Sequence, residues 1–82
     1  MMKHTSAALL LVALGHDTRL TIFRLLVRAG KDGLNIGEVG QYLDMAASTL
    51  ASHLKTLVDA GLVIQERQGR QIINSVDFDV MH

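Results

Sequence analysis

The sequence predicts a mainly α-helical fold with one small β-hairpin. Apolar residues recur at helical spacing along most of the 82-residue chain, and the spacing changes to that of strands only after Gly61. The chain also contains no proline, and its apolar runs are separated by short polar turns that contain glycine. A chain of this length makes one domain, which we place over residues 1–82.

The composition favours a small core that a partner subunit completes. Hydrophobic residues make up 49% of the chain, and only three are aromatic. A chain this short buries roughly 60–65% of its unfolded surface, so its core is marginal. The absence of cysteine excludes disulfides and thiolate metal sites as the remedy, which leaves oligomerisation.

The charge argues against a protein that coats nucleic acid without regard to sequence. Eight basic and eight acidic residues cancel, whereas non-specific binding depends on neutralising phosphates. A reader of one DNA sequence needs only a few contacts on one face, so this class stays open.

The first predicted helix covers residues 5–14 and ends at Gly15, a typical C-terminal stop. It is apolar on nearly all sides, which is typical of a helix buried between subunits. The apolar run after Lys3 also imitates a short secretory signal, but eight residues are few for that and too few to cross a bilayer. We therefore expect a cytoplasmic protein with no membrane contact. The predicted dimer-interface residues are Leu9, Leu10, Leu11, Leu14 and, near the other end of the chain, Met81.

A second helix is expected after Gly15, capped by Asp17 or Thr18, and a turn follows at Gly30-Lys31-Asp32-Gly33. The apolar positions of this second helix, at helical spacing, are Leu20, Phe23, Leu26 and Val27.

Residues 36–60 match a helix-turn-helix: a short helix over 36–43, a three-residue bend and a longer helix over 47–60. Leu50, Leu54, Leu57 and Val58 form the inward stripe of the longer helix. The second helix of such a pair presents small hydrogen-bonding side chains to base edges. The predicted DNA-binding residues on it are Ser48, Thr49, Ser52, His53 and Lys55, with His53 at the border of the stripe. The alternative is an ordinary amphipathic helix with a polar solvent face.

A hairpin is expected over residues 62–76, with strands at 62–65 and 72–76 around the turn Arg67-Gln68-Gly69-Arg70. Arg67, Gln68 and Arg70 are predicted to contact DNA, because long cations at a hairpin tip reach a phosphate or a minor groove. A solvated turn is the alternative. Residues 77–82 read as the start of a last helix. This order of elements predicts a winged helix-turn-helix.

The sequence resembles the ArsR-type repressors over nearly its whole length. The segments that carry the resemblance are 14–20, 48–55, 57–63, the tip 67–70 and the closing 76–81. The resemblance implies a homodimer joined by its first and last helices, with recognition helices in successive major grooves of an inverted-repeat DNA operator. It also implies release from DNA when an effector binds. The chain departs from the family pattern in lacking the cysteines that many members carry, and Ala51 stands where a serine is common. The effector therefore stays unknown.

Metal and catalytic sites are weakly supported. Asp79 and His82 share a helical face, but His4 and His16 lie elsewhere in the chain, so we predict no metal and no cofactor. Ser48, His53 and Asp59 lie on one helix and cannot converge as a catalytic triad, so no enzyme is expected. The predicted function is a sequence-specific DNA-binding transcriptional regulator, acting as a dimeric repressor released by an effector. The alternative is a winged-helix protein-interaction module that does not bind DNA.

Overall fold

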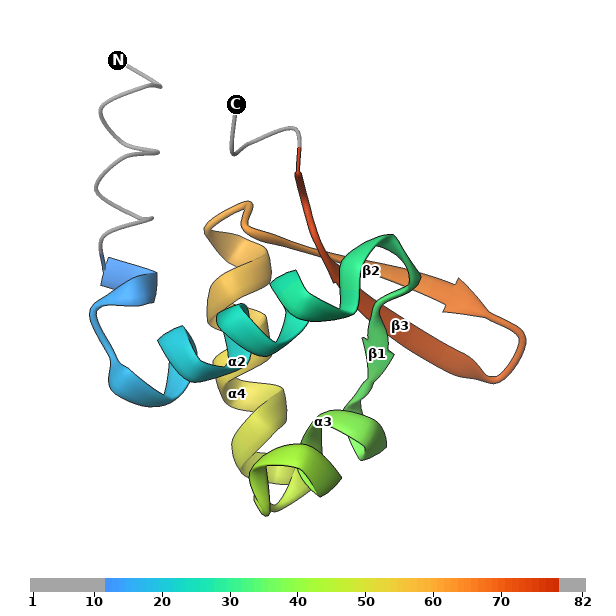
Figure 1. The fold of residues 1–82 in the computed structure, drawn as a ribbon, viewed down its shortest axis with the longest axis horizontal. Coiled ribbons are helices and arrows are strands. Elements are labelled where there is room, and N and C mark those ends of the chain that lie inside the picture. The colour runs from blue at the N-terminus through green and yellow to red at the C-terminus, as the bar shows by residue number, and fades with distance from the viewer. Residues whose placement is uncertain (1–11, 79–82) are drawn as a thin grey trace.

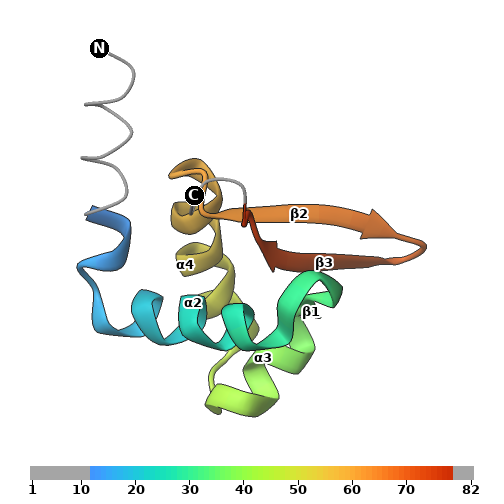
Figure 2. The same ribbon diagram turned by 45° about the horizontal axis from the view of Figure 1, so that its top comes forward.

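The computed structural model describes residues 12–78. Helices α2, α3 and α4 lie beside a three-stranded antiparallel sheet of order β1-β3-β2, and the β2–β3 hairpin projects away from the helices (Figures 1 and 2). The prediction of a mainly helical fold with a hairpin is confirmed. The elements in chain order are α2 (Asp17–Ala29), the 3-10 helix η1 (Gly30–Asp32), β1 (Leu34–Asn35), α3 (Ile36–Leu43), α4 (Ala47–Asp59), β2 (Val63–Gln68) and β3 (Gln71–Val76).

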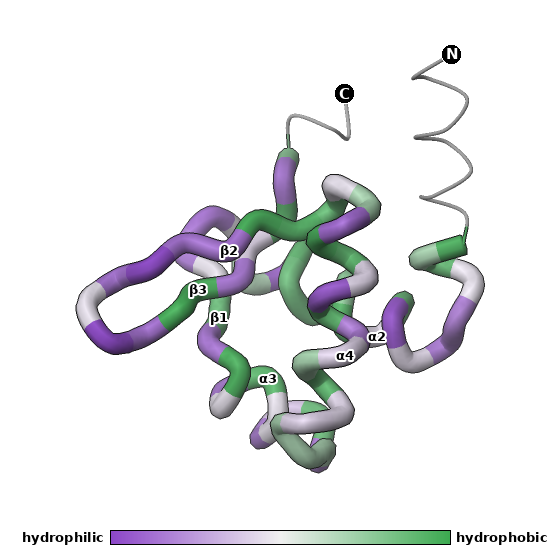
Figure 3. Tube along the Cα trace, turned by 180° about the vertical axis from the view of Figure 1, so that it is seen from behind, coloured by the Kyte–Doolittle hydropathy of each residue, from purple (hydrophilic) through white to green (hydrophobic). Residues whose placement is uncertain are grey.

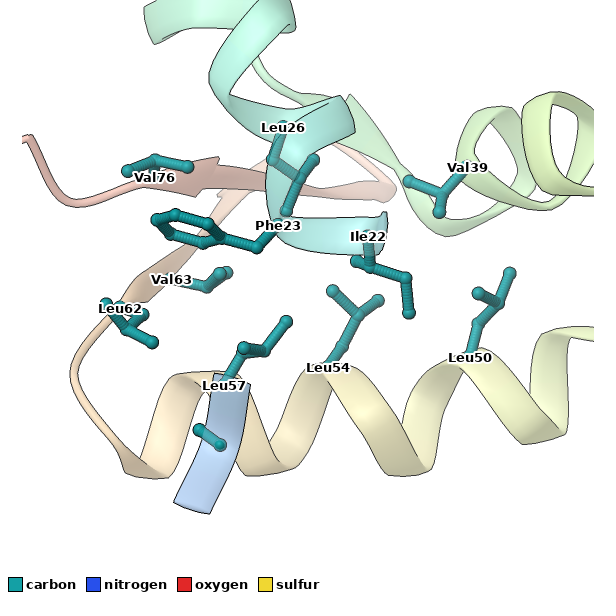
Figure 4. Close-up of a cluster of buried hydrophobic side chains, with 11 residues drawn as sticks. Ile22, Phe23, Leu26, Val39, Leu50, Leu54, Leu57, Leu62, Val63 and Val76 are labelled. Carbon is teal, nitrogen blue, oxygen red and sulfur yellow. The ribbon is translucent and has the colours of Figure 1, made fainter. Parts of the chain in front are cut away.

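The core lies where α2 and α4 meet the base of the hairpin (Figure 4). The predicted stripe of α4 is confirmed at Leu50, Leu54 and Leu57, which are at most 1% exposed, while Val58 is half-buried at its edge. Each fully buried aliphatic side chain stabilises the fold by about 1.5–3 kcal/mol. The other buried apolar residues are Ala13, Ile22, Phe23, Leu26, Val39, Leu62, Val63 and Val76.

Helix α2 begins one residue earlier than the sequence suggested. Its N-cap is His16, whose Nδ1 accepts a hydrogen bond from the backbone N–H of Thr18 at 3.2 Å. The prediction of Asp17 or Thr18 as the cap is therefore wrong. Asp17 instead occupies the first turn, where a carboxylate interacts favourably with the helix dipole.

Helix α3 has a capping box at its start. The Asn35 side chain accepts from the backbone N–H of Glu38 at 2.8 Å, and the Glu38 carboxylate accepts from the backbone N–H of Asn35 at 2.9 Å. The helix ends at Asp44, which adopts the left-handed conformation with φ 53°. Residues 44–46 then form the predicted bend, and α4 follows.

The segment predicted as a simple turn after α2 contains two elements instead, η1 and β1. Strand β1 pairs with β3, placing Leu34 opposite Asn74. At Gly33 the backbone has φ 64°, and an added Cβ would overlap the Asn74 carbonyl and the Ile73 side chain. Glycine is needed here both for its conformation and for the close approach of β3.

The hairpin is longer than predicted. Strand β2 extends to Gln68, which pairs with Gln71, so the turn consists of Gly69 and Arg70 alone. The predicted four-residue turn is wrong on this point, since Arg67 and Gln68 belong to the strand. Gly69, with φ 64°, supplies the positive φ that a two-residue hairpin turn requires.

The two predicted terminal helices lie mostly outside the described residues. Residues 12–14 are helical and a turn follows at Gly15, as expected for the end of a first helix. Leu14 packs partly against this chain's own core. At the other end, Asp77 is not helical and Phe78 lies in a turn. Residues 5–11, which include Leu9, Leu10 and Leu11, and residues 79–82, which include Met81, are outside the described part.

Candidate nucleic-acid interface

The N-terminal half of α4 presents a polar, exposed face. Ser48, Thr49, Ser52 and Lys55 are all exposed, while the inward stripe fixes the helix to the core. Helix α3 packs closely on α4 and the bend at Gly40, where an added Cβ would lie 3.3 Å from the Leu50 side chain of α4 and 3.0 Å from the Met45 carbonyl of the bend. The pair of helices therefore holds the polar face in a fixed orientation, as a recognition helix requires.

The register of the hairpin decides which side chains share a side with α4. Val63 pairs with Val76, and both are buried against the helices. Because side chains alternate along a strand, Arg67 and its partner Ile72 lie on the same face farther out. Arg67 therefore projects on the α4 side of the hairpin. Its Nε donates a hydrogen bond to the Gly69 carbonyl at 3.4 Å, which keeps the guanidinium at the tip.

Gln68 lies on the opposite face of the hairpin. Its side-chain amide donates to the carboxylate of Glu66 at 3.0 Å, two residues earlier on the same strand. The structure thus brings Arg67 and Arg70 together at the tip and turns Gln68 away from Arg67. The tip of the hairpin is hydrophilic, and hydrophobic colour appears farther down β3 (Figure 3).

A buried polar network connects the hairpin to the start of α3. Asn74 is 1% exposed, donates from Nδ2 to the Leu34 carbonyl at 3.2 Å, and accepts at Oδ1 from Gln65 at 2.9 Å. Beside it, Asn35 donates to the Gln71 side chain at 2.8 Å. These bonds fix the wing relative to the helix-turn-helix. Sequence analysis missed them because Asn74 and Leu34 are 40 residues apart.

His53 lies between the recognition face and α2. Its ring is 4.9 Å from that of His16, centroid to centroid, with the planes tilted by 47°. Burial lowers the pKa of His53 from the ordinary histidine value of 6.5, and the nearby His16 and Arg19 lower it further. Arg19 also donates to the carbonyls of Ala13 at 2.7 Å and Val12 at 3.1 Å. His53 is thus placed at the junction of three helical segments rather than on the open polar face.

The cations of the interface differ in their partners. Lys55 forms an ion pair with Asp59 at 2.8 Å, one turn later on α4. Both side chains are well exposed, so the pair contributes little to stability and Lys55 stays free to exchange partners. Arg70 makes no hydrogen bond or ion pair within residues 12–78, and Arg67 makes no ion pair there.

Residues 12–78 contain no group of three or more histidine, cysteine or carboxylate side chains placed to hold a metal ion. In the same part of the chain, no helix is long and apolar enough to cross a membrane.

Known proteins with similar sequences are transcriptional regulators. Residues 14–66 match the family described as "Helix-turn-helix domain". The chain is 34% identical over 70 residues to the HTH-type transcriptional regulator YgaV of Escherichia coli, covering 85% of this chain and 69% of that protein. It is 40% identical over 58 residues to the uncharacterised HTH-type transcriptional regulator YceK of Bacillus subtilis, covering 71% of this chain and 57% of that protein.

Solved structures share the fold. The transcriptional repressor PagR of Bacillus anthracis superposes with a TM-score of 0.82 at 29% identity, over 93% of this chain and 84% of that one. The homodimeric winged helix-turn-helix DNA-binding domain Mb0332 from Mycobacterium bovis, a possible ArsR-family regulator, gives 0.84 at 23% identity, over 98% and 72%.

These similarities confirm the predicted fold and the predicted resemblance, and they confirm that the chain is a regulator rather than an enzyme. The chain belongs to the helix-turn-helix family of DNA-binding transcriptional regulators, with the winged-helix fold of the ArsR type.

Proposed function

We propose that the chain acts in the cytoplasm as a dimeric repressor that binds an inverted-repeat operator and releases it when an effector binds. The observation that carries this proposal is that the polar face of α4 and the wing border one groove: Lys55 of α4 and Arg70 of the hairpin both line it, and Arg67 lies on the α4 side of the hairpin. One recognition helix and one wing on the same side fit a major groove and the groove next to it.

The contacts follow from chemistry and placement. Ser48, Thr49 and Ser52 are short donors and acceptors on the exposed face of α4, suited to base edges. Lys55, Arg67 and Arg70 are suited to phosphates or to a narrow minor groove. Gln68 and His53 are peripheral candidates: Gln68 lies on the far face of the hairpin, and the His53 ring packs against His16.

A dimer supplies the symmetry that an inverted repeat demands. In this proposal the interface is formed by the first and last helices, and the two recognition helices lie about 34 Å apart. The interface residues are Leu9, Leu10, Leu11 and Leu14 of the first helix and Met81 of the predicted last helix. Support comes from the composition, since a small core without disulfides gains from subunit contact. Further support comes from relatives: Mb0332 is described as homodimeric, and PagR as a repressor.

The salt dependence of DNA binding tests the proposal. Binding to the DNA upstream of the chain's own gene is measured by fluorescence anisotropy over a range of salt. Arg67→Ala should weaken binding to all sequences and flatten the slope of log K against log salt by about one unit. Lys31→Ala is the matched control, since Lys31 is exposed beside Ile64 on the opposite face of the hairpin. Equal slopes in all three proteins, or no preference for the upstream DNA over random DNA, would favour the protein-interaction alternative, which the zero net charge also allows.

A further inference from the structure

A groove of about 710 Å³ lies between α4 and the hairpin. Ala51, Leu54 and Val58 of α4 form one wall, Ile72 of β3 forms the other, and Ile36 lies at the start of α3. Pockets for small organic molecules commonly measure about 300–1,000 Å³ and are mostly apolar. The groove is therefore of the size and character of a small-molecule site.

DNA binding does not account for the apolar character of this groove. Protein–DNA interfaces are polar and strongly positive, yet Ile72 leaves 51% of its surface exposed there. On the facing wall, Ala51 lies three residues after Ser48, so it borders the recognition face on α4. Ile72 and Ala51 on the two walls of the groove, beside the proposed DNA-binding face, are better suited to an apolar ligand than to a phosphate chain.

The rim of the groove carries one cation without a partner. Lys55 is paired with Asp59 at 2.8 Å, whereas Arg70 has no hydrogen bond or ion pair within residues 12–78 and also lines the groove. An anionic group on the ligand would give the Arg70 guanidinium the partner that it lacks, by a charge-assisted hydrogen bond.

We infer that this groove is the effector site and that it takes an organic anion: an apolar ring system or chain with one carboxylate or sulfonate directed at Arg70. The inference rests on the proposed function, in which the effector is the ligand that releases the repressor from DNA. Bound there, the ligand occupies the space between the recognition helix and the wing and engages the same arginine that DNA phosphates require. Ligand and DNA then compete for Arg70, which provides the release step.

The first test measures ligand binding without DNA, so its outcome does not depend on the proposed function. The probe is anilinonaphthalene sulfonate, followed by its fluorescence, with the uncharged N-phenylnaphthylamine as the matched probe. The sulfonate should bind at least about tenfold more tightly than the amine, and Arg70→Gln should remove that difference. Equal affinity of the folded protein for the two probes would overturn the inference.

Variants locate the site. Ala51→Phe fills the groove from α4, and Ile72→Thr removes one apolar wall while keeping a β-branched residue in the strand. Both should weaken sulfonate binding about tenfold or more. The control is Ile64→Thr, the same change on the opposite face of the hairpin, which should leave binding unchanged. Thermal melts confirm that each variant is folded. An equal effect of Ile64→Thr and Ile72→Thr, or full binding by Ala51→Phe, would place the probe elsewhere and overturn the inference.

The second test measures coupling to DNA. Saturating sulfonate should weaken binding of the labelled upstream DNA by about 5- to 150-fold, the usual range of coupling between sites. Ile72→Thr, which lies outside the proposed DNA contacts, should bind DNA like the parent and need about tenfold more probe for the same response. If the probe binds in the groove and DNA affinity does not change, the effector role is refuted. If DNA does not bind at all, the proposed function fails while the ligand measurement stands.

Discussion

Replacing single side chains on α4 should separate base reading from folding. Ser52 and Leu54 are two residues apart on the same helix, but Ser52 is exposed and Leu54 is 1% exposed within the core. Ser52→Ala and Leu54→Ala therefore change neighbouring positions with opposite environments. Thr49→Ala, also at an exposed position, is a second variant that tests the reading of bases.

The expected magnitudes follow from what each change removes. Leu54→Ala deletes three buried carbons, worth roughly 2.4 kcal/mol of transfer free energy at about 0.8 kcal/mol each. A residual cavity raises the cost to about 2–5 kcal/mol. At roughly 0.05–0.15 kcal/mol per residue, the whole chain has a free energy of unfolding of about 4–12 kcal/mol. Leu54→Ala thus removes a large part of the stability. Ser52→Ala and Thr49→Ala should change stability by less than about 0.5 kcal/mol.

DNA selectivity should show the opposite order. Loss of a base contact typically costs about 1–3 kcal/mol of discrimination, so Ser52→Ala and Thr49→Ala should reduce the preference for upstream DNA over random DNA. Leu54→Ala, assayed well below its melting temperature, should keep that preference. The assays are a competition binding measurement and thermal melting on the same preparations.

Two outcomes would refute this reasoning. If the exposed polar variants melt far below the parent while their DNA preference survives, the face of α4 packs against something and does not read bases. If Leu54→Ala keeps its stability but loses preference, the division of α4 into an inner and an outer side is wrong.

Three further changes test other parts of the structure. Asn74→Ala should lower the free energy of unfolding by about 1–3 kcal/mol, because the Leu34 carbonyl and the Gln65 amide lose the partner that Asn74 provides; Ser75→Ala, on the other face of β3, is the control in urea unfolding, and equal effects would contradict the role of the network. The folded state favours neutral His53, because the pKa of His53 lies below the ordinary 6.5. The contribution of His53 to the free energy of unfolding is therefore complete above pH 6.5, and it is lost as the pH falls from 6.5 through the folded pKa. Melts of the parent and of His53→Gln between about pH 5 and 8 should show the parent losing more stability on the acid side, and parallel curves would speak against it. Leu10→Glu, outside the described residues, should give monomers or insoluble protein in sedimentation experiments, whereas a stable monomer of the parent at micromolar concentration would exclude the predicted dimer.

The helical part of the fold could be predicted because its signals are local. The inward stripe of α4 at Leu50, Leu54 and Leu57 repeats at helical spacing, and the structure buries all three residues. The bend at 44–46 follows from the interruption of that spacing. What local signals missed was β1, since a two-residue strand has no periodicity of its own and exists only through its pairing with β3. The cap of α2 was missed for a different reason: histidine is not a common N-cap residue, and here a ring nitrogen takes the place of the usual oxygen acceptor.

The composition of the wing was predictable, but the direction of its side chains was not. Arg67, Gln68 and Arg70 were grouped because they surround Gly69 in sequence. A turn of four residues would have put them all in a loop, whereas the observed turn of two leaves Arg67 and Gln68 in β2, where neighbouring side chains point to opposite faces. The pairing of Gln68 with Gln71 decides this, and moving the turn by one residue would exchange the two faces. Strand register therefore selects Arg67 for the α4 side, and the same register places its partner Ile72 on that side, where Ile72 lines the groove. The DNA contact and the ligand site that we propose thus depend on one feature, the two-residue turn at Gly69 and Arg70.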